Sequence, residues 1–219
     1  MIETHEHGGD FKEPMNFPAL ANYYALVADE FLRAYFVLGL NGVRLHVRYF
    51  VMAHCLELAF KASLANRSVP IEYGKIHNLT VLENHLVQQG DSCFEKLRPD
   101  ASAREVFARM FQPDVGNFIM ADWRRHAEAI ELLLCYRHIA DLKYGMDKQG
   151  RNILAVTLST VIMNSRFLGY VECARRNFPD REKFDREMIK FVAGIEHKFP
   201  TLFTGALTAL QLHAGRVNG

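Results

Sequence analysis

The feature that most constrains the fold is a charged pair inside an apolar segment. Glu57 and Lys61 lie four residues apart in HCLELAFKASL, residues 54–64, which is otherwise almost entirely apolar. Side chains at this spacing meet on one face of an α-helix, where a glutamate followed by a lysine forms a favourable ion pair. Because an unpaired buried charge is costly, we expect a helix in which these two side chains pair with each other or with a functional group.

Apolar residues recur at intervals of three and four along most of the chain, which predicts further helices. The expected helices span residues 17–38, 44–66, 78–88, 101–111, 117–143, 152–177, 180–199 and 203–213. β-Branched residues at 156–162 leave a strand as the alternative there. Alternating strand patterns are scarce and Gly-rich phosphate loops are missing. We therefore expect an all-α protein, an antiparallel bundle of four to five helices with a C-terminal helical extension.

Composition restricts the class of protein. The chain has 219 residues, 49% of them hydrophobic, which is enough for one large domain. Its formal net charge is +1. Since an obligate nucleic-acid binder usually carries a clear basic excess, any binding of nucleic acid must depend on a local patch.

The cysteines and the N-terminal sequence indicate the cellular compartment of the protein. Cys55, Cys93, Cys135 and Cys173 are widely spaced, with no Cys-x-x-Cys pair, and three lie in apolar helical segments. This pattern favours buried free thiols over disulfides or zinc. Residues 1–10 lack the features of a signal peptide, and no apolar run is long enough to cross a bilayer. We expect a cytoplasmic protein without membrane contact, cofactor or metal.

Several short motifs, in a fixed order, carry a resemblance to a known family. They are Asn-Tyr-Tyr at residues 22–24, His-x-x-Glu-Leu-x-x-Lys-Ala-x-Leu at 54–64, Tyr-Gly at 73–74 and His-Asn-Leu at 77–79. This order resembles the HEPN (higher eukaryotes and prokaryotes nucleotide-binding) family, in which Glu-Leu-x-x-Lys-Ala is followed by His-Asp-Leu. The resemblance implies a helical bundle, frequently a homodimer, that acts as a metal-independent ribonuclease or as the helical partner of a nucleotidyltransferase.

The resemblance also suggests a division of the chain. Residues 1–16 are expected to form a flexible N-terminal tail, and residues 17–145 the HEPN-like bundle. Residues 146–219 lie outside the resemblance and are expected to form a helical extension packed on the bundle.

Nuclease members of the family carry Arg-x(4–6)-His in a late helix. Arg137 and His138 lie in the corresponding place and are the candidate catalytic residues. The positions of the family's catalytic histidine hold Leu142, Lys143 and Tyr144. A tyrosine, with a pKa of about 10, is a poor general base near neutral pH. The resemblance therefore implies binding of RNA or a nucleotide, with metal-independent endoribonuclease activity weak or lost.

A basic stretch precedes this pair and is a candidate phosphate-binding site. Arg124 and Arg125, together with Tyr144, would contact phosphate, which guanidinium groups bind bidentately. Arg124 and His138 are fourteen residues apart, close to four full turns of a helix, and would share a face. The alternative is a solvated face with nearby glutamates as counter-charges.

For the polar motif residues, a structural role is favoured over a ligand-binding or catalytic one. Glu57 and Lys61 are expected to form an ion pair at the edge of the bundle. His77 and Asn78 are expected to cap a helix and fix a loop. His54 is expected to be a core histidine that is hydrogen-bonded to a neighbouring helix. Arg175 and the charged run at 180–183 are expected at the surface.

Two functions from different classes remain. The first is an RNA- or nucleotide-binding HEPN-like protein, most simply a homodimer. The second is a non-catalytic helical interaction module, such as a partner or antitoxin-like subunit that docks on another protein through an apolar face.

Overall fold

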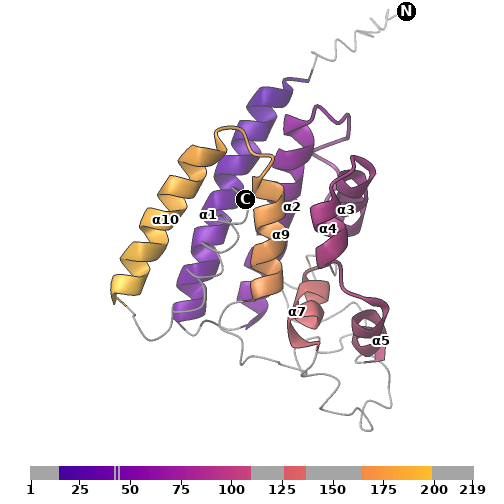
Figure 1. Cartoon of the computed structure of the whole chain (residues 1–219), viewed down its shortest axis with the longest axis vertical. Coiled ribbons are helices and arrows are strands. Elements are labelled where there is room, and N and C mark those ends of the chain that lie inside the picture. The colour runs from indigo at the N-terminus through magenta and orange to yellow at the C-terminus, as the bar shows by residue number, and fades with distance from the viewer. Residues whose placement is uncertain (1–14, 42, 44, 110–125, 137–163, 199–219) are drawn as a thin grey trace, which may run out of the picture.

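Two long helices form the centre of the fold. In a computed structural model, which describes residues 15–41, 43, 45–109, 126–136 and 164–198, α1 spans Phe17–Leu40 and α2 spans Leu45–Asn66. They lie side by side and run antiparallel, because only a short connection follows Asn41 (Figure 1). Buried Ala21, Ala25 and Ala28 line the inner face of α1, so the two helices can approach closely.

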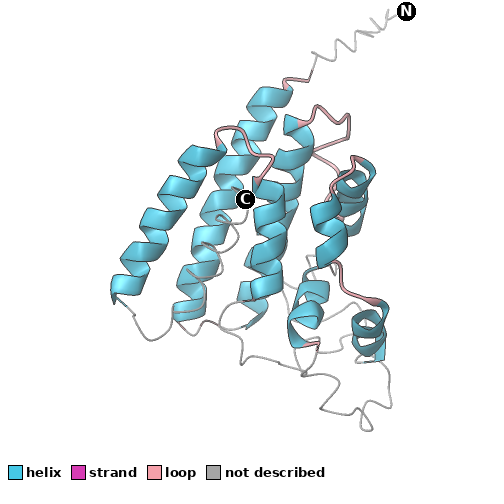
Figure 2. Cartoon of the chain, viewed as in Figure 1, coloured by secondary structure: helices cyan, strands magenta, loops and turns pink. Residues whose placement is uncertain are grey.

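The other helices surround this hairpin. In chain order they are α3 (Leu79–Gln88), α4 (Ser92–Leu97), α5 (Ala101–Arg109), α7 (Ala127–Cys135), α9 (Ser165–Arg175) and α10 (Arg181–Lys198). Helices α3, α7 and α9 pack on α2, whereas α10 lies along α1 at the opposite edge of the molecule (Figure 1). Within the described residues every regular element is an α-helix (Figure 2), which confirms the expected all-α bundle.

Local capping explains where several helices start and stop. The Asn78 side chain accepts hydrogen bonds from the backbone N–H groups of Thr80 (2.9 Å) and Val81 (3.3 Å), as its predicted N-cap role requires. Gly90 follows the end of α3 with φ of 79°, a left-handed conformation that glycine adopts without steric cost.

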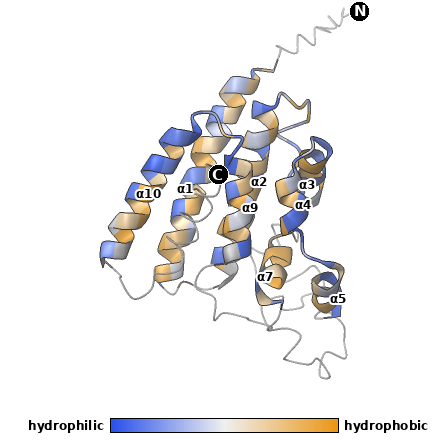
Figure 3. Cartoon of the chain, in the orientation of Figure 1, coloured by the Kyte–Doolittle hydropathy of each residue, from blue (hydrophilic) through white to orange (hydrophobic). Residues whose placement is uncertain are grey.

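The hydrophobic core runs through the whole described part of the chain. Phe60 of α2, Phe94 of α4 and Tyr170 of α9 form an aromatic cluster with ring centroids 5.3–6.3 Å apart. Phe167 of α9 and Val192 of α10 are fully buried in the same core. Hydrophobic residues extend along α7, and hydrophilic ones gather in the first turns of α10 (Figure 3). The described residues after 145 therefore supply helices to one shared core.

Two expected helices are shorter than predicted. The helix expected over 117–143 begins at Ala127, after the non-helical His126, and ends at Cys135. The Tyr136 N–H bonds to the Leu133 carbonyl, three residues back, which closes the last turn. The helix expected over 152–177 begins at Ser165, because the Asn164 side chain caps it by accepting from the Phe167 N–H (2.8 Å). Residues 156–162 and 203–213 lie outside the described residues.

The cysteine prediction is wrong for one pair. Cys93 of α4 and Cys173 of α9 form a disulfide, with Cα atoms 5.9 Å apart, whereas Cys55 and Cys135 are free and buried. The six-residue α4, which the sequence pattern did not predict, packs on α9 and brings together cysteines 80 residues apart. Over the described ranges, none of the helices is both long enough and apolar enough to cross a membrane.

Candidate functional site

The residues predicted to bind or cleave RNA fall outside the described part of the chain. These are Arg124, Arg125, Arg137, His138 and Tyr144. Because α7 is bounded by non-helical His126 and by Tyr136 beyond its last turn, no single helix runs through both positions. The helix expected over 117–143 is therefore not continuous, and the placement of Arg124 and His138, which lie outside the described residues, stays a prediction.

The five polar motif residues are described, and three of them, His54, Lys61 and His77, lie around Glu57. Oε1 of Glu57 accepts a hydrogen bond from Nζ of Lys61 at 2.8 Å, so the predicted ion pair is present. The same oxygen lies 2.9 Å from Nδ1 of His77, which is 20 residues further along the chain. The carboxylate thus joins α2 to the loop before α3.

Lys61 differs from its prediction in burial. Its side chain is 3% exposed, and that of Glu57 is 6% exposed, so the pair lies inside the protein and not at the edge of the bundle. Nζ of Lys61 is 5.7 Å from the centroid of the Tyr24 ring, which stacks on the Tyr73 ring at 5.9 Å. A cation over an aromatic face is stabilised by the ring quadrupole, which partly replaces the hydration that Lys61 loses.

Tyr24 and Tyr73 lie beside this cluster and were not among the predicted site residues. Both lie in the motifs that carry the family resemblance, in Asn-Tyr-Tyr and in Tyr-Gly, so a signal was present in the sequence. Burial raises the pKa of each phenol, so both hydroxyls stay protonated at neutral pH.

His77 has one ring nitrogen, Nδ1, held by Glu57, although most of its side chain is exposed. Its side chain is 61% exposed, although Nδ1 faces the buried Glu57. An ionised carboxylate can only accept hydrogen bonds, so Nδ1 must carry the hydrogen. In the neutral imidazole the lone pair is then on Nε2, which is the ring nitrogen that does not face Glu57.

His54 occupies the other side of the carboxylate. Its Nδ1 is 3.9 Å from Oε2 of Glu57, and its ring lies 5.4 Å from Phe31 and 4.5 Å from Phe50. Burial lowers the pKa of His54, against the opposing effect of Glu57, so its imidazole is neutral at pH 7. The sequence predicted that His54 is hydrogen-bonded to a neighbouring helix. In the structure His54 contacts the neighbouring helix α1 through the ring of Phe31.

The second oxygen of Glu57 is incompletely satisfied. Oε2 is buried and accepts no hydrogen bond from any residue that the structure describes. Its nearest charged partner is His54, at a distance too long for a hydrogen bond. The carboxylate therefore has a free acceptor position in an otherwise paired cluster.

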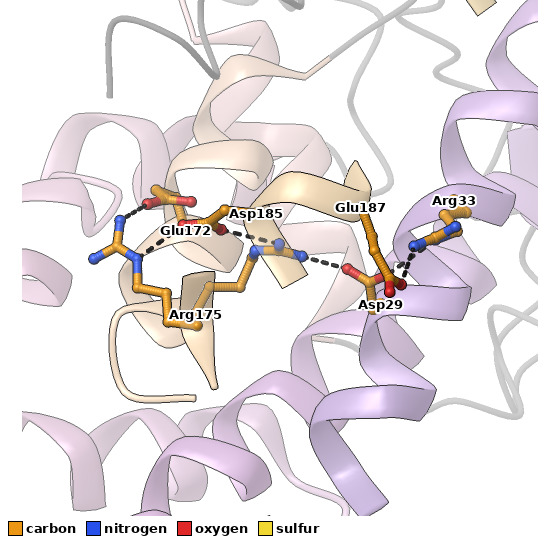
Figure 4. A network of polar contacts seen from close by, with 7 residues as sticks. Asp29, Arg33, Glu172, Arg175, Asp185 and Glu187 are labelled. Carbon is orange, nitrogen blue, oxygen red and sulfur yellow. Dashed lines mark hydrogen bonds and ion pairs between the residues drawn. The ribbon is translucent and has the colours of Figure 1, made fainter. Parts of the chain in front are cut away.

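A separate charged network links α1, α9 and α10 (Figure 4). Arg175 of α9 donates to Asp29 of α1 at 2.5 Å and to Asp185 of α10 at 3.1 Å. Arg33 also pairs with Asp29, and Glu172 with Arg181. Arg175 is 3% exposed, so its predicted surface position is wrong. Its partners Asp29 and Asp185 come from α1 and α10, so the network holds three helices together, which is a structural role.

Two broader tests add no further assignment. Among the residues that the structure describes, no three or more histidine, cysteine, aspartate or glutamate side chains are placed to hold a metal ion. Comparison of the chain with protein-family models, curated proteins and solved structures finds no match.

Proposed function

We propose that this chain is a HEPN-like helical bundle that binds RNA or a nucleotide. The observation that supports the proposal is the cluster of Glu57, Lys61 and His77. These residues belong to two of the motifs that carry the resemblance, and Lys61 and His77 both bind Glu57, His77 from 20 residues further along the chain. The Glu57–Lys61 contact follows from helical spacing, so it is the contact of Glu57 with His77 that brings the two motifs together in space.

In this proposal the chain forms a cytoplasmic homodimer. Arg124, Arg125 and Tyr144 contact phosphate, together with Arg137 and His138. Endoribonuclease activity, if retained, is metal-independent and weak, because Leu142 and Lys143 stand where the family carries its catalytic histidine. In a reducing cytoplasm the Cys93–Cys173 disulfide would be open.

RNA binding by the purified chain tests this function. Fluorescence anisotropy with a labelled single-stranded RNA should show salt-dependent binding, because phosphate contacts release counterions. Arg137→Ala should weaken binding about tenfold, the loss expected for a contact worth about 1.4 kcal/mol.

The matched control is Arg186→Ala. Arg186 is an exposed arginine on α10 whose ion pair with Glu182 is 3.6 Å long, and its removal should leave binding unchanged. Absence of binding, or equal affinities for Arg137→Ala and wild type, contradicts the proposal.

One observation favours the alternative function, a helical interaction module. Tyr23 and Leu26 lie on the same face of α1, three residues apart, and are 60% and 52% exposed. Exposed apolar residues in a row are typical of protein interfaces. A chain that binds no RNA, and whose sedimentation changes on Leu26→Ser, would fit this alternative.

A further inference from the structure

Glu57 holds Nδ1 of His77 while most of the His77 side chain is exposed, an arrangement that suits proton transfer. We infer that His77 is the proton acceptor of this protein, with Glu57 as its positioning residue. The inference rests on the proposed function and deepens it: the group that accepts a proton lies at the start of α3, far along the chain from Arg137 and His138.

The first argument is the geometry of the imidazole. Nδ1 of His77 is 2.9 Å from a carboxylate oxygen whose side chain is almost completely buried, whereas the His77 side chain is mostly exposed. A carboxylate behind a histidine fixes the tautomer and the ring orientation and stabilises the imidazolium that forms on proton uptake. The basic Nε2 is then available at the surface.

The second argument is that Glu57 is itself held in place. Lys61 binds the oxygen that faces His77, and Lys61 is buried and covered by the Tyr24 ring. The lysine therefore keeps the carboxylate oriented toward His77. A surface ion pair with two mobile side chains could not provide the same precision.

The third argument is the rigidity of the loop that carries His77. The Tyr73 hydroxyl donates to the Val69 carbonyl at 2.8 Å, and the Lys75 N–H donates to the Glu72 carbonyl at 2.9 Å. Asn78, directly after His77, caps α3. The backbone before and after His77 is therefore held by hydrogen bonds, and its ring is held by Glu57.

Aromatic side chains beside the cluster indicate the kind of ligand. Tyr23 is exposed and contacts Tyr24 edge-on at 5.5 Å, and Tyr24 stacks on Tyr73. Exposed aromatic rings stack on unpaired bases of single-stranded RNA. Tyr24 lies over Lys61, and Lys61 binds the same Glu57 oxygen as His77, which connects the aromatic rings to the imidazole.

The reaction on RNA needs only one proton acceptor from the protein. His77 Nε2 takes the proton of a ribose 2′-hydroxyl, and the 2′-oxygen attacks the adjacent phosphorus. A new P–O2′ bond forms, the P–O5′ bond breaks, and the leaving 5′-oxygen takes a proton from water. The products are a 2′,3′-cyclic phosphate and a 5′-hydroxyl, and His77 returns its proton to water. In this scheme water, and no side chain of the protein, protonates the leaving group, so the reaction is slow.

Cleavage of a fluorescent RNA oligonucleotide in EDTA tests the inference. His77→Ala should lower kcat at least about a hundredfold, the usual contribution of a general base. His197→Ala, which removes an exposed histidine of α10, should cleave as wild type does. Product masses should show the cyclic phosphate, and an oligonucleotide with 2′-deoxyribose at every position should not be cut.

The role of Glu57 needs a spectroscopic measurement. In wild type, ¹⁵N NMR should show His77 protonated at Nδ1, and Glu57→Gln should shift the hydrogen toward Nε2 and slow cleavage. A purely structural role for Glu57 would leave the tautomer unchanged in a variant that still folds. Circular dichroism on each variant identifies any loss of fold, and the exposed His77→Ala remains informative if Glu57→Gln unfolds.

These experiments distinguish failure of the proposed function from failure of the inference about His77. If the wild type binds no RNA, the proposed function falls and this inference falls with it. If it binds RNA without cutting it, or if His77→Ala cuts as fast as wild type, the inference falls and the proposed function stands. Protonation of His77 at Nε2 in the wild type also overturns the inference.

Discussion

At the scale of single residues, the chain keeps a lysine and a glutamate inside its core. Burial of two charges costs free energy that their attraction and hydrogen bonding must offset, and removal of one partner leaves the other uncompensated. Glu57 and Lys61 satisfy each other across one helical turn, and His77 adds a second donor. The pair therefore constrains which substitutions the fold tolerates.

Lys61→Met should destabilise the protein by about 3–5 kcal/mol, because Glu57 is left buried without its cation. The double variant Glu57→Gln/Lys61→Met should recover much of that loss. Urea unfolding measures both. Lys75→Ala, which breaks an exposed pair with Glu72, is the control and should have little effect. A single variant as stable as wild type would contradict the buried pairing.

His54 should give the stability a dependence on pH. Burial lowers its pKa below the ordinary value of 6.5, so between these two values the unfolded chain binds a proton that the folded chain does not. The free energy of unfolding then falls as pH drops below about 6.5 and levels off once the lowered pKa is passed.

His54→Gln should remove this part of the acid dependence, as measured by urea unfolding at a series of pH values. His197→Gln, at an exposed position, should retain it. Parallel profiles for wild type and His54→Gln would show that His54 does not titrate differently in the folded chain.

The sequence predicted only part of this residue-scale picture. The Glu57–Lys61 pair follows from helical spacing alone, since both residues share one turn. The contact between Glu57 and His77 depends on how the intervening loop folds back, and no local rule gives that. Burial of Arg175 was missed for the same reason, because its partners Asp29 and Asp185 come from two other helices.

At the scale of the elements, helix ends followed from side chains that bond their own backbone. Asn78 and Gly90 bound α3 through local geometry, and both were predictable. With six residues, α4 is too short for the apolar spacing of a helix to be recognised in the sequence. Its position depends on its contacts with α3 and α9. The ends of α7 were missed because apolar spacing continues past the point where its backbone stops being helical.

The cap at Asn78 should have a measurable effect on stability. Asn78→Ala should lower the free energy of unfolding by about 1 kcal/mol, since two backbone N–H groups lose their acceptor. Asn78→Ser keeps an N-cap side chain and should retain most of the stability. Denaturant unfolding of the three proteins measures this, and equal values for alanine and asparagine would exclude the capping role.

At the scale of the whole molecule, covalent and ionic links cross the core between distant segments. The Asp29–Arg175–Asp185 network joins α1, α9 and α10, and the Cys93–Cys173 disulfide joins α4 to α9. The all-α class was predictable from periodicity, whereas these links were not, because each depends on the final arrangement of the helices.

The disulfide should stabilise the fold when it is closed. A link across 80 residues restricts the unfolded chain and contributes about 4 kcal/mol in the loop-entropy model. Thermal unfolding with and without reductant should show a lower Tm in reductant. Cys93→Ser/Cys173→Ser should show no such difference, although Cys55 and Cys135 remain. An unchanged Tm of the wild type in reductant would contradict a stabilising bond.

The same bond also divides the chain topologically. It closes residues 93–173 into a covalent ring, which contains Arg124, Arg125, Arg137, His138 and Tyr144, whereas Glu57 and His77 lie outside it. A protease that cuts once anywhere within the ring yields two fragments that remain one molecule until a reductant is added. A single cut beside Arg137 or His138 therefore leaves the two fragments joined by the disulfide. A single cut between Glu57 and His77 yields two fragments with no covalent bond between them.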